Sequence, residues 1–162
     1  MTKKRGIIYL IIGVIFGIFD FYYQTYVQEL GLSTLPLTVL CFGIWLVPLL
    51  KIAWYESKQS QSRRKTVVAS ILTWSSSIVS CYLFLAINLM FIGRESSIYL
   101  HISNHSSPYF WSNWISVFYN QVLIGIIEWL PFALVGGFVI GRFVYFLVTH
   151  LSKKTTNSDS MS

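Results

Sequence analysis

The sequence predicts an all-α integral membrane protein in which four transmembrane helices form an antiparallel bundle. Of the 162 residues, 54% are hydrophobic and only 11% are charged, whereas soluble domains carry about 25% charged residues. The apolar residues fall in four continuous blocks, and each block can supply the ~20 residues that a helix needs to cross ~30 Å of hydrocarbon. We expect the helices at about residues 6–27, 31–54, 66–92 and 115–149, within one transmembrane domain of residues 1–151.

Basic residues predict the orientation of these helices. Four crossings place three clusters of Lys and Arg on one side of the membrane, and the positive-inside rule makes that side cytoplasmic. Eleven of the twelve basic residues belong to these clusters, which are Lys3, Lys4 and Arg5; Lys51, Lys58, Arg63, Arg64 and Lys65; and Arg142, Lys153 and Lys154. We therefore expect both termini in the cytoplasm and the protein in the cell membrane. The net charge of +6 follows from this bias and does not indicate nucleic-acid binding, so the lipid bilayer is the expected partner.

The connections between the blocks differ in length and character. The short first connection, residues 28–33, predicts that the first two helices form a hairpin. The second, residues 55–65, reads YESKQSQSRRK and predicts a polar, flexible cytoplasmic linker. The third, residues 94–118, is expected outside, and it ends in a short aromatic segment of the kind found at membrane interfaces. Residues 152–162 are rich in Ser, Thr and Lys and predict a disordered cytoplasmic tail.

Glycines mark one face of the first helix. At about 100° per residue, one stripe of this helix contains Gly6, Gly13, Gly17, Asp20 and Gln24. Gly13 and Gly17 form a GxxxG motif, which allows another backbone to approach closely. We therefore expect this stripe to face protein and to direct Asp20 inward.

The last helix has two sides that carry polar or small residues. One side contains Gln121 and Glu128, and the other side carries a small-residue series at Ala133, Gly137 and Gly141. Small residues at intervals of four are typical of helix–helix contacts in membranes. Packing within the chain is the favoured explanation of this series, and contact with a homodimer partner or another membrane protein is the alternative.

Two acidic residues lie deep within the expected helices. At a rise of 1.5 Å per residue, Asp20 lies about 22 Å beyond Arg5, and Glu128 lies about 21 Å beyond Arg142, so both occupy one level of the outer half of the bilayer. No Lys or Arg is expected at that depth, so these carboxyls must be protonated, hydrated or paired with a cation. We predict a substrate- or ion-binding site that contains Asp20, Glu128, Gln24, Gln121, Ser77 and Ser80. The alternative is that Asp20 lies at the membrane interface and reaches water.

Metal and redox chemistry have little support in the sequence. His101 and His105 are four residues apart, a spacing that suits two metal ligands on one helical face, but two ligands are too few for a metal site. We therefore expect a solvated loop, no bound metal and no cofactor. Cys41 and Cys81 lie within expected helices, where they are expected to be small buried residues and not partners in a disulfide or a CxxC motif.

Three classes of function fit this organisation. The favoured one is a transport-related protein whose acidic site binds a proton, a cation or a cationic solute, because acids within membranes mark ion and proton pathways. The alternative is a non-catalytic accessory, immunity or regulatory protein that packs against a larger membrane complex. We expect no enzymatic activity and assign no catalytic residue, since the sequence lacks a GxGD context or a nucleophile elbow that would indicate an intramembrane hydrolase.

Overall fold

The computed structural model describes residues 1–92 and 104–159, with side chains to residue 151, and these ranges contain helices but no strand. In chain order the elements are α1 (Lys3–Glu29), α2 (Thr34–Ser60), α3 (Arg63–Ile87), the π-helical turn η1 (Asn88–Ile92), α5 (Phe110–Val117), the π-helical segment η2 (Phe118–Leu123) and α6 (Ile124–Asp159). Within the described residues, four helical spans are long and apolar enough to cross a membrane: Lys3–Glu29, Thr34–Ser60, Arg63–Ile92 and Phe110–Leu151. The predicted all-helical chain with four such helices is confirmed.

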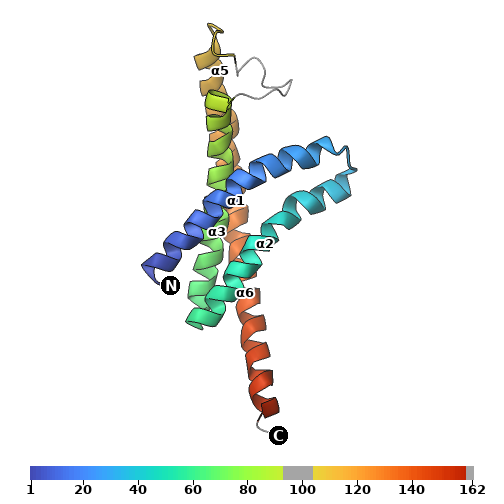
Figure 1. Ribbon diagram of the computed structural model, residues 1–162, viewed down its shortest axis with the longest axis vertical. Coiled ribbons are helices and arrows are strands. Elements are labelled where there is room, and N and C mark those ends of the chain that lie inside the picture. Colours follow the sequence, from blue (N-terminus) through green and yellow to red (C-terminus); the bar gives the residue numbers. More distant parts are fainter. Residues whose placement is uncertain (93–103, 160–162) are drawn as a thin grey trace.

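The helices form two pairs that diverge from each other (Figure 1). Helix α3 lies beside the column of α5, η2 and α6, and α1 crosses α3. Helices α1 and α2 form the hairpin that their short connection predicted, and Gly31 in that connection has a φ of +61°, which glycine adopts without strain. The tip of this hairpin points away from α3 and α6 (Figure 1). The distance between the hairpin and the α3–α6 pair therefore increases toward the hairpin tip.

Glycines on α1 allow its backbone to lie directly against α3. A Cβ added at Gly13 would lie 2.5 Å from the Thr73 carbonyl oxygen, and one added at Gly17 would lie 2.9 Å from the Ser80 Cβ. The Ser80 hydroxyl uses this close approach to donate a 2.8 Å hydrogen bond to the Val14 carbonyl of α1. The glycine face of α1 is thus buried against α3.

The small residues of α6 serve the same purpose on the other side of α3. A Cβ added at Gly137 would lie 2.9 Å from the Ile71 Cα, and one added at Gly141 would lie 2.7 Å from the Val67 Cα. Ala133, the first member of the series, is fully buried. The series is therefore covered by α3 of the same chain, and no second copy is needed to cover it.

Helix α2 extends further than the sequence predicted. It continues to Ser60, so the flexible linker expected over residues 55–65 is reduced to Gln61 and Ser62. Gln61 ends α2 in the left-handed conformation, with a φ of +44°. The physical reason for the correction is that Glu56, the second residue of the expected linker, is buried and paired with a cation instead of solvated. Because burial of Glu56 against Arg5 holds this residue on α2, the helix continues through the stretch that the sequence predicted to be a linker.

The last helical column is also longer than predicted at both ends. It begins at Phe110 instead of 115, so the aromatic segment expected at the interface forms the first turns of the same column. The Trp114 indole holds these turns to α3 by donating a 3.1 Å hydrogen bond to the Ala86 carbonyl. At the other end, α6 is drawn to Asp159, within the stretch for which the sequence predicts a disordered tail, and that tail stays a prediction.

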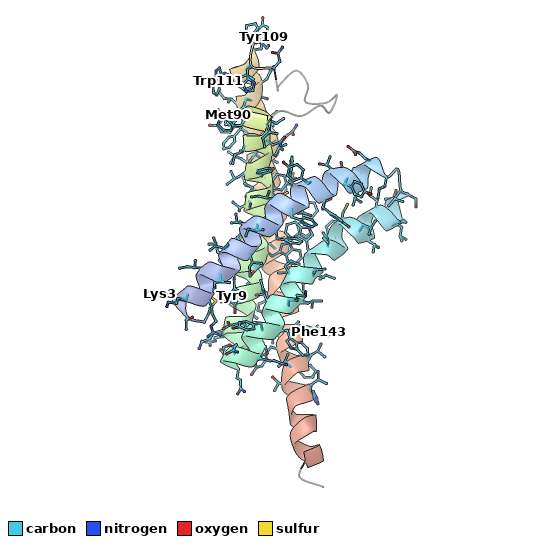
Figure 2. All side chains as sticks on the ribbon, viewed as in Figure 1. Lys3, Tyr9, Met90, Tyr109, Trp111 and Phe143 are labelled. Carbon is cyan, nitrogen blue, oxygen red and sulfur yellow. The ribbon has the colours of Figure 1, made fainter. Side chains whose placement is uncertain are left out.

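The described residues at the two ends of the molecule differ in character: basic residues lie toward one end, and aromatic residues lie at the other. Lys3 and Tyr9 lie toward the end that holds the N-terminus, the α2–α3 connection and the C-terminus, whereas Met90, Tyr109 and Trp111 lie at the opposite end (Figures 1 and 2). Most of the expected third connection lies outside the described residues, which resume at Asn104.

Candidate functional site

A cavity of about 760 Å³ lies where the α1–α2 hairpin diverges from α3 and α6. All four of these helices contribute residues to its wall. Cavities of about 300–1,000 Å³ are of the size that encloses a small molecule. The position and size of this cavity make it the candidate functional site.

Asp20 lies in the cavity wall with only 1% of its surface exposed. The Nε2 of Gln24, one turn further along α1, donates 3.2 Å hydrogen bonds to Asp20 Oδ1 and to the Cys41 carbonyl of α2. The Cys81 thiol of α3 is a further polar neighbour of the carboxyl group. No Lys, Arg or His occurs among the described residues that line the cavity. Asp20 therefore has polar neighbours but no positively charged one in this wall.

Aromatic rings form a large part of the remaining wall. Trp129 of α6 and Phe42 of α2 have ring centroids 5.4 Å apart, and Trp45 of α2 and Trp74 of α3 have ring centroids 6.1 Å apart. The aromatic residues that line the cavity are Phe21, Phe42, Trp45, Trp74, Tyr82, Trp129 and Phe132. The cavity thus combines one buried acid with many apolar ring surfaces.

Two glycines of α6 make room for rings of α3. A Cβ added at Gly136 would lie 2.8 Å from Cη2 of the Trp74 ring. One added at Gly125 would lie 2.6 Å from Cζ of the Tyr82 ring. Because these rings rest directly on the α6 backbone, their positions depend on the absence of a side chain at residues 125 and 136.

The two acids that the sequence predicted to share a site differ in burial, although both lie close enough to Tyr82 to interact electrostatically with it. Asp20 is buried in the cavity wall, whereas Glu128 is exposed on α6 and does not line the cavity. Gln121 is also exposed, on η2. Only one of the two predicted carboxyls therefore belongs to the described lining of this cavity, and the two-carboxyl site stays a prediction. The physical reason is that α6 turns its small-residue side, which includes Gly137, toward α3.

The two predicted serines lie at the contact between α1 and α3, outside the cavity wall. Ser77 is buried, and its backbone carbonyl faces Gly17. Ser80 donates its hydroxyl to the Val14 carbonyl. Of the six residues predicted for the site, only Asp20 and Gln24 line the cavity.

The described part of the chain contains no group of three His, Cys, Asp or Glu side chains that could hold a metal ion. His105 stacks on Phe110 with ring centroids 4.6 Å apart and contacts the Met90 carbonyl. His101, the other candidate ligand, lies outside the described residues. Cys41 and Cys81 are free, half-buried thiols, and both line the cavity.

A second buried carboxylate, Glu56, lies near the basic end of the molecule, and no sequence pattern predicted it. Its Oε2 lies 3.0 Å from Arg5 Nη1 and accepts a 2.7 Å hydrogen bond from the Tyr9 hydroxyl. Its neighbours in sequence are polar, so nothing in the local pattern distinguishes it from a solvated residue. A helix-face comparison offers one signal, since Arg5 and Tyr9 are four residues apart on α1 and can reach a single partner.

No sequence pattern predicted that the tryptophans of the cavity would belong to a site either. Trp45, Trp74 and Trp129 all lie in the interiors of their helices, whereas tryptophan in membrane helices is enriched at the two interfaces. This interior placement is the signal that could have indicated a ligand cavity.

No protein-family model matches the chain, and no curated protein or solved structure matches it either. The function must therefore follow from the chemistry of the cavity. One buried carboxyl in a wall without basic residues favours a positively charged ligand over an anion.

Proposed function

We propose that this chain is a transport-related membrane protein that binds a proton, a cation or a cationic solute at Asp20. The observation that supports the proposal is the burial of Asp20 in the wall of a solute-sized cavity whose described lining has no basic residue. Removing a carboxylate from water without a positive partner is strongly unfavourable. Asp20 is therefore protonated or takes up a cation, and acids within membrane helices serve this purpose in ion and proton pathways.

The proposal can be tested by comparing Asp20→Asn with Glu128→Gln. Thermal unfolding of the purified protein in detergent would be measured with Na⁺, K⁺, Mg²⁺ and a series of alkylammonium ions, over a range of pH. We expect at least one cation to stabilise the wild type and Glu128→Gln but not Asp20→Asn, because only Asp20 lies in the cavity. The same cation should then cross proteoliposome membranes in an Asp20-dependent way. Equal responses of wild type and Asp20→Asn to every cation and to pH would overturn the proposal.

The proposal places both termini in the cytoplasm and the protein in the cell membrane. Its support is the distribution of charge: Lys3 and the basic start of α3 at Arg63 lie toward the end of the molecule that also holds the C-terminus. The positive-inside rule assigns such an end to the cytoplasm. The cavity then extends from the middle of the membrane into its outer half, since its lining runs from Gly136 of α6 to the distal half of α1.

A non-catalytic accessory, immunity or regulatory role is the second candidate, and the rim of the cavity favours it. Phe132 and Val135 of α6 are 62% and 66% exposed, and both lie on the cavity wall. A helix of a larger membrane complex could cover this apolar rim. In that case a partner would remain bound to Asp20→Asn and would be lost when Phe132 and Val135 are replaced by polar residues.

A further inference from the structure

We infer that the ligand of the cavity is a bulky organic cation, such as an aryl phosphonium or a quaternary ammonium, and not a metal ion or a proton alone. This inference rests on the proposed function, because it assigns a chemical class to the ligand of Asp20. Three features of the cavity support it: the number of oxygen ligands, the volume, and the aromatic wall.

Asp20 supplies the only charged oxygen ligands for a hard metal ion, because the other oxygen-bearing side chains of the described lining, such as Gln24, Thr25 and Gln28, are neutral. Ca²⁺ takes six to eight oxygen ligands, and Mg²⁺ requires near-octahedral coordination. Asp20 is the only carboxylate that lines the cavity in the described chain. The nearby Cys41 carbonyl already accepts a hydrogen bond from Gln24. A single carboxylate can instead balance the charge of an ion that brings its own apolar shell.

The volume of the cavity exceeds what a proton or a bare ion requires. The half-open cavity offers about 760 Å³ of space, which falls in the range of cavities that bind drug-sized molecules. An organic cation fills such a space with apolar groups, and burial of those groups stabilises the complex. The charge and the bulk of the ligand are thus matched by different parts of one cavity.

The aromatic wall provides the third feature. The faces of Trp, Tyr and Phe rings attract cations, most strongly when water is excluded. The Trp45–Trp74 pair and the Trp129–Phe42 pair bring rings from α2, α3 and α6 to the same cavity as Asp20. Each cation–ring contact strengthens binding by roughly 2- to 30-fold. A cation with spread charge can use several of these rings together with the carboxylate.

Tryptophan fluorescence provides a direct test with the full chain in detergent. Tetraphenylphosphonium is the probe, and triphenylphosphine oxide is a neutral compound of related shape. We expect saturable quenching of wild-type fluorescence by tetraphenylphosphonium and none by the oxide. Asp20→Asn should weaken binding by about 30-fold or more, because a buried charge loses its partner. Trp129→Leu should weaken it by roughly 2- to 30-fold, because one ring face is lost.

Trp54→Leu is the matched control, since Trp54 lies on α2, does not line the cavity and should not alter the affinity. If Trp129→Leu does not fold, Phe132→Leu tests the same wall at a more exposed position. No binding of tetraphenylphosphonium, with Asp20-dependent stabilisation by an inorganic cation or by protonation, would overturn the assigned class and leave the proposed function intact. No Asp20-dependent response to any cation or to pH would overturn both. Equal binding of tetraphenylphosphonium and the neutral oxide, unchanged in Asp20→Asn, would identify an apolar ligand and would overturn the assigned class.

Discussion

The hydroxyl of Tyr9 on α1 donates a 2.7 Å hydrogen bond to Oε2 of Glu56 on α2. Arg5 places its Nη1 3.0 Å from the same oxygen. Glu56 is completely buried, whereas the Arg5 side chain remains partly exposed. These three side chains join α1 to α2 at the end of the molecule opposite to the hairpin tip. This contact holds α1 against α2 at the end of the hairpin that lies away from the cavity.

Removing Arg5 should destabilise the protein more than removing a neighbouring surface lysine. Arg5→Ala leaves Glu56 buried with only the N-terminal ammonium, 3.6 Å from its Oε1, as a cation, so the loss should be at most about 3 kcal/mol, the value typical of breaking a buried ion pair. Lys4 is exposed, so Lys4→Ala should change stability by less than about 0.5 kcal/mol. Thermal and denaturant unfolding in detergent would measure the difference. If the two variants are equally stable, Glu56 does not depend on Arg5.

Gly17→Ala should weaken the packing of α1 on α3, whereas Gly43→Ala should not. A Cβ at residue 17 would lie 3.0 Å from the Cys81 backbone nitrogen, so the helices would have to separate. Overpacking of this kind typically costs about 1–3 kcal/mol. Gly43 has nothing within 4 Å of an added Cβ, and alanine there should be neutral or stabilising by up to about 1 kcal/mol. Equal unfolding temperatures would contradict the described contact.

Gly141→Leu should reduce stability without changing the oligomeric state. Val67 of α3 already occupies the space beside Gly141, with its Cα 2.7 Å from an added Cβ. The control is Val139→Leu, because Val139 is exposed on the same helix. Unfolding measurements and size-exclusion chromatography in detergent would test both variants. A Gly141→Leu protein of normal stability but altered size would show that this face joins two copies.

The sequence revealed the contact faces of the helices more reliably than the site. Gly13 and Gly17 have no side chain beyond hydrogen and are spaced as in close helix packing, and the structure buries both. Glu128 was harder to place, because α6 has two suitable sides and helical periodicity does not say which one faces α3. Glu56 lies among polar residues, so its burial depends on Arg5, a partner 51 positions away that no local pattern reveals.

Sidedness can be tested with single cysteines and a membrane-impermeant thiol reagent. Asn104→Cys and Ser62→Cys lie in different connections, and the positive-inside rule puts the basic α2–α3 connection in the cytoplasm. We expect Asn104→Cys to react in intact cells and Ser62→Cys to react only after lysis. The wild type, which retains Cys41 and Cys81, gives the background. Labelling of both positions in intact cells would contradict the proposed orientation.

Gly136→Ala should reshape the cavity while leaving the acid untouched. The added methyl group would collide with the Trp74 ring, whose Cη2 would lie 2.8 Å away and whose Cε3 would lie 3.3 Å away. The ring can move only by leaving the α6 backbone, and the cavity that it lines offers open space. We therefore expect a shift in tryptophan fluorescence and a cavity that holds less ligand volume, because the Trp74 ring would occupy part of it. An organic cation that binds the wild type should bind Gly136→Ala more weakly, by roughly tenfold if about 1.4 kcal/mol of ring contact and space is lost.

Gly43→Ala is the control for this prediction, because it adds the same methyl group to a helix of the hairpin where there is free space. Gly43→Ala should keep the wild-type spectrum and affinity. Unchanged fluorescence and binding in Gly136→Ala would mean that α6 moves away as a whole and the Trp74 ring stays in place. If α6 moves away from α3, the neighbouring contact between Gly137 and Ile71 should be lost as well. The variant should then unfold at a lower temperature than the wild type. The two measurements together thus distinguish a ring that moves into the cavity from a helix that moves outward.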